Sequence, residues 1–410
     1  MVRILVLASL YLGILENIAS IFTYFDEVIA FFLLCYIFIY LMSQKNKLYF
    51  NSIEKLILLL TIIFSIFSVI SSIISTYENT FFLQAYTLFG DIKFIIYYFG
   101  FKLLFRNYKI NDKHALFFLR QTYLFMIVFV SLYIVNIPLN FMETYSYRFG
   151  LENISYGYDH PAVFSTIVIL QLSINLYFTA IIYKKINYFY IIGSLFLLLT
   201  SGRVISIGFL ALLFVLVMSY RYLRRYVFNG ALISALVLLL VGFEKLKETF
   251  ISDTQPRGIL LHTSIRIAQD IFPFGSGLGT FGSNASRINY SSVYYNYGIS
   301  DSFGLSPVFG AYLTDSYWAM IIGEIGFIGA LTIVVILILM FLNFYNQSKN
   351  IFGIMTITPM LYLIVSSPVD TILVSNSVCY IMIILCFLWS INKQEISKKN
   401  NKLLGEMRSA

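Results

Sequence analysis

The sequence predicts an all-α integral membrane protein that crosses the bilayer many times. Hydrophobic residues make up 59% of the 410 residues and charged residues only 12%, roughly half the charged fraction of a typical soluble domain. The apolar residues gather in runs close to the roughly 20 residues that a membrane-spanning helix needs. One long polar stretch interrupts these runs. We therefore expect a polytopic helical bundle that carries one large loop.

The apolar runs predict about twelve transmembrane helices. Each run is bounded by a polar turn, as expected for segments that emerge from the bilayer. Because the segments 187–200 and 204–220 are short and the first pair is crowded, a count of eleven or thirteen also fits the pattern. The candidate spans are 4–23, 27–43, 54–76, 81–104, 115–136, 161–182, 187–200, 204–220, 227–243, 315–345, 351–366 and 370–391.

Basic residues predict the orientation, because loops rich in Lys and Arg are retained on the cytoplasmic side. Lys and Arg gather in alternate connections, whereas the short turns between them hold one basic residue, Arg203. This pattern places both termini in the cytoplasm and the long polar loop outside it. The net charge of +8 is then mostly an orientation signal, which argues against a nucleic-acid partner. The basic inner segments are QKNK, RNYKINDK, YKK, RYLRR, Lys349 and the KKNNK tail.

The long polar loop is the main region outside the membrane. Ordered loops of this length are usually functional, and we expect this one to contain short helices. A second outer connection, 137–160, is shorter. The predicted regions are an N-terminal bundle of about nine spans (1–243), the extracytoplasmic loop (244–314), the C-terminal spans (315–392) and a basic cytoplasmic tail (393–410).

Polar groups that could carry chemistry gather on the outer side, and polar groups near a membrane tend to mark function. Arg203 lies in a three-residue turn between two spans. The planar guanidinium binds phosphate oxygens bidentately, so Arg203 fits the headgroup of a lipid diphosphate. Alternatively, the Arg203 side chain could extend to the headgroups of ordinary phospholipids. The other outer candidates are Arg148, Asp159, His160, Arg257, His262, Arg266, Asp270, Arg287 and Asp315.

Two acids mark the span that follows the large loop. Asp315 lies at its start, where a helix cap is the role that local physics favours. A carboxylate there could also act as a general base toward a sugar hydroxyl, and the two roles are compatible. Glu324 lies inside the span beside Gly323, Gly326 and Gly329, which let another helix approach closely. We expect Glu324 to hold the helix against a polar partner.

Asp91 and Lys93 are charged residues inside the fourth predicted span. Residues two apart do not face each other on a helix, so these two cannot pair together. Each therefore requires a partner elsewhere in the bundle.

Neither a cofactor nor a metal is predicted. The stretch GLGTFG (277–282) matches the dinucleotide fingerprint, but that fingerprint requires a preceding strand in a βαβ unit, which is absent from the sequence pattern. These glycines are interpreted as turn residues. The histidines His114, His160 and His262 are too scattered to suggest a metal site.

Taken together, these features resemble the O-antigen polymerase and O-antigen ligase family of bacterial polysaccharide assembly. The resemblance covers about 145–345, and its order, spacing and side of the membrane are more specific than any single motif. An R-x10-G pattern from Arg266 to Gly277 is also similar to one seen in polymerases. The stretches that carry it are RFGLENISYGYDHPAVFS, LLLTSGRVISIG, FPFGSGLGTFG and DSYWAMIIGEIGFIGAL.

The resemblance implies a glycosyltransferase in the bacterial cytoplasmic membrane that acts on undecaprenyl-diphosphate-linked oligosaccharides at the outer face. It implies Asp315 and His160 as catalytic residues, and no cofactor. A chain-length regulator and a flippase are implied partners, beside the lipid bilayer. The implied diphosphate-binding residues are Arg203, Arg266 and Arg148, with Glu324, Arg287 and His262 in supporting roles.

The last motif favours the polymerase branch. Ligases of the family carry His, then Asn, Ser or Gln, then nine residues and G-x-x-G. This chain keeps the frame with Asp315, Ser316, Gly326 and Gly329, but Asp replaces His. We expect a polymerase of O-antigen, capsule or exopolysaccharide, with a ligase as the alternative. A flippase and a structural membrane protein without chemistry are the other classes, and the charged groups inside spans keep transport open.

Overall fold

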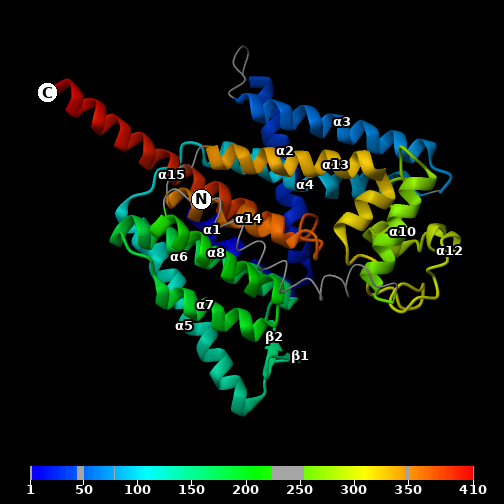
Figure 1. The fold of residues 1–410 in the computed structure, drawn as a ribbon, viewed down its shortest axis with the longest axis horizontal. Helices are drawn as coiled ribbons and strands as arrows, with labels where there is room; N and C mark the ends of the chain where they lie inside the picture. The colour runs from blue at the N-terminus through cyan, green and yellow to red at the C-terminus, as the bar shows by residue number, and fades with distance from the viewer. Residues whose placement is uncertain (1, 44–49, 78, 224–253, 347–350, 410) are drawn as a thin grey trace.

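The computed structural model describes residues 2–43, 50–77, 79–223, 254–346 and 351–409, which are mostly α-helical (Figure 1). The helices before the large loop are α1 (Val2–Ile18), α2 (Phe25–Ser43), α3 (Ser52–Ile74), α4 (Phe81–Phe105), α5 (Asp112–Leu139), α6 (Pro161–Tyr183), α7 (Tyr188–Ser201) and α8 (Val204–Leu223), with a short 3-10 helix η1 (Ser20–Tyr24) between the first two. The later helices are α10 (Pro256–Asp270), α11 (Asn284–Ile288), α12 (Ser292–Asn296), α13 (Tyr317–Asn346), α14 (Ile351–Ser366) and α15 (Asn376–Ser409).

Six described helices are long and apolar enough to cross a membrane, and three more are apolar but shorter. The all-α membrane class is therefore the class that the structure has, whereas the number of spans stays a prediction. The predicted span 227–243 lies outside the described residues; the other predicted spans overlap helices. The predicted boundary at residue 392 has no counterpart in the backbone, because α15 continues to Ser409.

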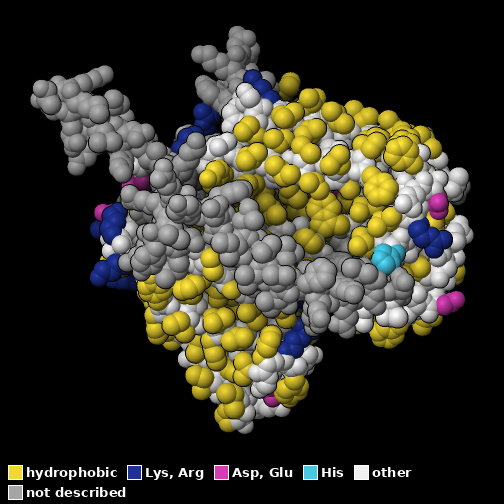
Figure 2. Space-filling view, in the orientation of Figure 1, with side chains coloured by type: hydrophobic (Ala, Val, Ile, Leu, Met, Phe, Trp, Pro, Cys, Tyr) yellow, Lys and Arg dark blue, Asp and Glu magenta, His cyan; other side chains and the backbone are white. Residues whose placement is uncertain are grey.

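Helix α3 shows how this bundle reverses the polarity of a soluble protein. Its outward side chains, such as Ile62, Ile66 and Ile73, are large and apolar, whereas Ser68 and Ser71 are fully buried. Figure 2 shows hydrophobic side chains spread over the face formed by α3 and α13. An apolar exterior around polar interior contacts is the arrangement that a lipid environment stabilises, because hydrocarbon cannot hydrogen-bond to polar groups.

The centre of the bundle is formed by α6 and α15. In each of these helices the most apolar 18-residue stretch is 89% buried. Helix α15 packs against α4, α14, α6 and α1, and α13 packs against α3 and α10. In Figure 1 the helices of the large loop, α10 and α12, lie at one end of α13, away from the C-terminus of α15. The loop and the tail therefore occupy opposite ends of the molecule.

Both long connections, 137–160 and 244–314, are folded where the structure describes them. Strands β1 (Thr144–Arg148) and β2 (Leu151–Ile154) form an antiparallel hairpin within the connection 137–160, a feature that the helical periods did not predict. The turn residues Phe149 and Gly150 both have positive φ, which suits the twist of a two-residue hairpin. The large loop has its own buried cluster, which includes Leu260, Phe281 and Tyr294.

The glycine-rich stretch 272–282 lies against the start of α13. Gly326 has φ +82°, and this kink leaves carbonyls of α13 free to accept bonds from outside the helix. The amides of Ser276 and Gly277 donate to the carbonyls of Gly323 (2.8 Å) and Glu324 (2.9 Å). A Cβ on Gly326 would lie 2.7 Å from the carbonyl oxygen of Phe274, so only glycine fits. Two of the four motif stretches thus form one packed unit.

Glu324 completes this unit. Its side chain is fully buried, and its Oε1 accepts a hydrogen bond from the amide of Phe281 at 3.1 Å. The hydroxyl of Ser71, on α3, donates to the carbonyl of Glu324. The glycines of GLGTFG therefore form the loop that wraps the Glu324 side chain, which agrees with their interpretation as turn residues.

Candidate functional site

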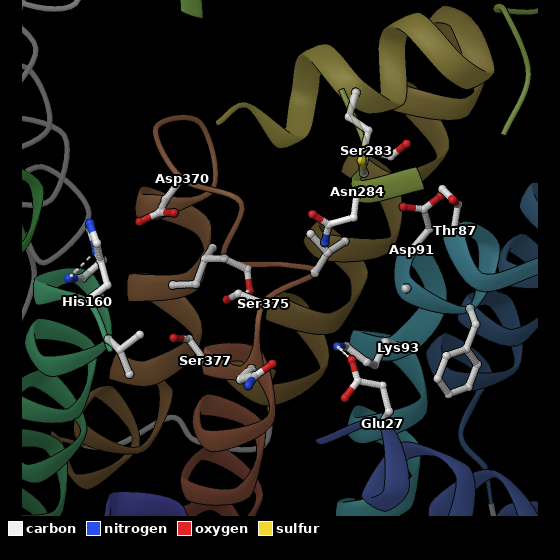
Figure 3. Close-up of a pocket in the computed structure, with 18 of the residues that line it drawn as sticks. Glu27, Thr87, Asp91, Lys93, His160, Ser283, Asn284, Asp370, Ser375 and Ser377 are labelled. Atoms are coloured by element: carbon white, nitrogen blue, oxygen red, sulfur yellow. Dashed lines mark hydrogen bonds and ion pairs between the residues drawn. The ribbon is translucent and has the colours of Figure 1, made fainter. Parts of the chain in front are cut away.

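A cavity of about 380 Å³ opens at the end of the bundle that carries the large loop. It is lined from the starts of α4 and α6, from α11 and α13, and from the connection between α14 and α15. Figure 3 shows His160 and Asp370 on one side of it, Glu27, Asp91 and Lys93 on the other. Connections that are far apart in the sequence thus converge on one polar space.

Arg203 lies in the turn between α7 and α8. Gly202 ends α7 with φ +66°, and its amide donates to the carbonyl of Leu199. The Arg203 carbonyl then accepts the first amides of α8. The Nη2 of Arg203 lies 2.5 Å from the Oδ2 of Asp370, in the turn between α14 and α15. This ion pair is partly exposed, with 22% and 30% of the two side chains accessible, so its charges can meet a ligand.

The β-hairpin braces this turn. A Cβ on Gly202 would lie 2.4 Å from the side chain of Asn153, on β2, so the close approach requires glycine. Arg148 donates from Nη1 to the carbonyl of Gly202 at 3.1 Å. The resemblance implies a diphosphate-binding role for Arg148. In the structure, the Arg148 guanidinium instead contacts Gly202, the residue that precedes Arg203. This hydrogen bond holds the turn from which Arg203 extends.

Asp315 pairs with a residue from the large loop. Its Oδ2 lies 3.2 Å from the Nη2 of Arg257, on α10. The expectation that Asp315 caps α13 is wrong: the hydroxyl of Ser316 accepts a hydrogen bond from the amide of Ala319 instead. The correction has a simple physical reason, since Arg257 attracts the carboxylate of Asp315 and Ser316 is already in position to satisfy the helix amide.

The charges of Arg257, Asp370 and Arg203 all act on the pKa of Asp315. Burial raises the pKa of Asp315 above its usual value; Arg257 opposes this rise, Asp370 adds to it, and Arg203 also opposes it. A carboxylate with a raised pKa is a stronger base than an exposed one. The charges of two guanidinium groups, those of Arg257 and Arg203, therefore act on the carboxyl of Asp315.

His160 caps the start of α6. Its Nδ1 accepts a hydrogen bond from the amide of Ala162 at 3.1 Å, and Pro161 occupies the first helical position. Burial lowers the pKa of His160, and the Arg203 charge lowers it further, which favours the neutral ring. Because Nδ1 accepts a bond, the neutral ring carries its proton on Nε2. In this arrangement His160 can donate a hydrogen bond at the cavity rim rather than act as a base.

The three remaining predicted residues lie on the large loop. Arg266 is exposed on α10, and its guanidinium carbon lies 5.7 Å from the ring centroid of Tyr297. Arg287 is exposed at the end of α11, and His262 is half-buried on α10. The observed contact of Arg266 is thus with an aromatic ring of the loop, and its predicted contact with a diphosphate stays a prediction.

One residue of the site, Asp370, is not among the candidates that the sequence suggests, and Arg257 is a candidate to which the sequence assigns no partner. The available signal was that an acid in an outer turn could neutralise Arg203, but nothing local shows which turns meet. Among the residues that the structure describes, no group of three or more His, Cys, Asp or Glu side chains could hold a metal ion.

Comparisons of this chain with family models, with curated proteins and with solved structures found no match.

Proposed function

We propose that the protein is a membrane glycosyltransferase that polymerises glycans carried on a lipid diphosphate. The observation that carries the proposal is the electrostatic coupling of two partly exposed ion pairs, Arg203–Asp370 and Arg257–Asp315, of which Asp370 lines a polar cavity at one end of an apolar bundle. Guanidinium groups at this depth suit a diphosphate, and a neighbouring carboxylate suits a sugar hydroxyl. The resemblance of the four motif stretches to the O-antigen polymerase and ligase family supports the same assignment.

The proposed reaction joins two lipid-linked glycans. A hydroxyl oxygen of the acceptor sugar forms a bond to the anomeric carbon of the donor glycan, and the bond from that carbon to the diphosphate oxygen breaks. The diphosphate leaves with the bonding electrons, and the hydroxyl proton moves to Asp315. Because diphosphate is already a good leaving group, the protein mainly positions the reactants and stabilises developing charge.

Arg203 and Arg257 are the proposed diphosphate ligands. Each guanidinium has five N–H donors, and the ion pairs with Asp370 and Asp315 engage one Nη atom of each. Donors therefore remain for phosphate oxygens without either carboxylate being displaced. Arg257 takes the place that the sequence reasoning gave to Arg266, because Arg257 is the loop arginine that contacts Asp315.

The first experiment measures the size and sidedness of lipid-linked glycans in cells that lack the protein. Single repeat units that accumulate on the outer side support the polymerase. Long lipid-linked polymer that never reaches its final acceptor would instead identify a ligase, in which Asp315 takes the place of His. Units trapped on the inner side would identify a flippase, the class that the buried charges of α4 keep open. An unchanged glycan profile would refute all three.

A further inference from the structure

Asp91 is a buried acid whose carboxyl has no hydrogen-bond partner within the described part of the chain. Its side chain is 1% exposed, and neither Oδ1 nor Oδ2 has a hydrogen-bond partner among the residues that the structure describes. Lys93, two residues further along α4, pairs with Asp26 at 2.5 Å and with Glu27 at 3.8 Å. Leaving a buried polar group unpaired costs about 1–3 kcal/mol, so such a group calls for an explanation.

Asp91 is one of the residues that line the cavity. Figure 3 shows it beside Thr87, on the opposite side of the space from His160 and Asp370. A ligand in the cavity can therefore supply the hydrogen bonds that the protein does not. The ligand would reach from the ion pairs near Arg203 at one end to Asp91 at the other.

The rest of the lining indicates what kind of ligand this is. Hydroxyl and amide side chains supply many hydrogen bonds, and the rings of Tyr86 and Phe89 supply apolar surface. This mixture suits a saccharide, which presents hydroxyl groups around an apolar ring face. About 380 Å³ lies at the small end of the range of ligand pockets, roughly 300–1,000 Å³, so the cavity holds the end of a glycan rather than a long chain.

The charged residues of the lining indicate which kind of saccharide the cavity can accept. Its cationic candidates are Lys93, which is already paired, and His160, whose ring favours the neutral form. An acidic ligand placed among carboxyl groups would be repelled, whereas an amine would be attracted. The acidic residues that line the cavity are Glu16, Glu27, Asp91, Asp159 and Asp370; Glu27 and Asp370 are paired with Lys93 and Arg203, so Glu16, Asp91 and Asp159 leave an excess of acidic groups.

We propose that the Asp91 end of this cavity is a saccharide subsite in which Asp91 hydrogen-bonds an uncharged or amino-bearing sugar, and from which the acidic lining excludes acidic sugars. The diphosphate of the same molecule stays at the Arg203 end. The assignment of the ligand as a glycan rests on the proposed function. The selectivity follows from the charges of the lining.

Saturation-transfer NMR on the full chain in lipid nanodiscs tests the subsite. The probes are N-acetylglucosamine, glucosamine and glucuronic acid at equal concentration. We expect signals from the first two that exceed the glucuronic acid signal at least several-fold. In Asp91→Leu these signals should fall to the level of glucuronic acid, whereas Asp270→Leu, which changes an exposed acid on α10 outside the cavity, should keep them.

Asp91→Asn serves as the second variant if Asp91→Leu does not fold. It keeps the shape of the side chain but removes its acidic group, so the glucosamine signal should fall because the attraction for the amine is lost. No signal from any sugar, equal binding of glucuronic acid, or full binding to both Asp91 variants would overturn the subsite. The glycan profile of cells that lack the protein is a separate readout. Altered polymer with no sugar binding refutes only the subsite, and sugar binding with unaltered polymer refutes only the polymerase.

Discussion

Glu324 and Asp91 are two buried acids of the helical bundle that differ in the hydrogen bonds they receive. Glu324 accepts a hydrogen bond on Oε1 from the loop amide of Phe281, so its carboxylate joins the large loop to α13, while its Oε2 has no partner among the described residues. Asp91 faces the cavity and has no such bond within the part of the chain that the structure describes. A buried carboxyl that accepts a hydrogen bond from another segment holds the fold together, whereas one that accepts none within the described residues is available to a ligand.

The largest expected effect comes from Glu324→Leu. The amide of Phe281 would lose its acceptor inside the bundle, and an unsatisfied buried donor costs about 1–3 kcal/mol. We expect a clear fall in thermal stability in detergent and easier proteolysis of the large loop. Glu324→Gln keeps an oxygen acceptor and should recover most of the loss. Wild-type stability of Glu324→Leu would contradict the structural role.

The matched change Asp91→Leu should behave differently. Because Asp91 has no described partner to lose, replacing it with an apolar residue should leave thermal stability unchanged or raised. Glycan polymer should nevertheless be shortened or lost, as judged on gels at equal protein level in the membrane. If Asp91→Leu were as destabilising as Glu324→Leu, the contrast between the two acids would fail.

Arg203→Lys sharpens the comparison at the opposite end of the cavity. Lysine keeps the charge but loses the planar fork that holds both Asp370 and a phosphate. We expect polymer formation to fall about tenfold or more, equivalent to about 1.4 kcal/mol of transition-state stabilisation. The protein should still reach the membrane in normal amount. Arg120→Lys, on an exposed arginine of α5, is the control that should keep wild-type activity.

The smallest effect concerns pH. Asp315 must be ionised to accept a proton, so activity falls as the pH drops through its pKa. Burial raises this pKa, which places the acid limb of the pH–rate profile above the ordinary aspartate value of about 3.9. Arg257 lowers the same pKa, so Arg257→Ala should move the acid limb to higher pH as well as weaken diphosphate binding. An acid limb that does not move would remove Asp315 from the role of base.

The sequence by itself determined the membrane class, the positions of most helices and the outer connections that carry polar groups. These are local properties, because hydropathy and helical length are set by neighbouring residues. Ser201–Arg203 and the glycines near residue 277 could be recognised as turns for the same reason.

Only the tertiary structure decided which groups meet. Asp370 neutralises Arg203 from 167 positions away, and Arg257 draws Asp315 out of the expected helix cap. The contrast between Glu324 and Asp91 was equally hidden, because each is simply an acid in an apolar run. The packing of helices across the bundle determines which groups a buried charge contacts. The spacing of residues along one helix does not predict that packing.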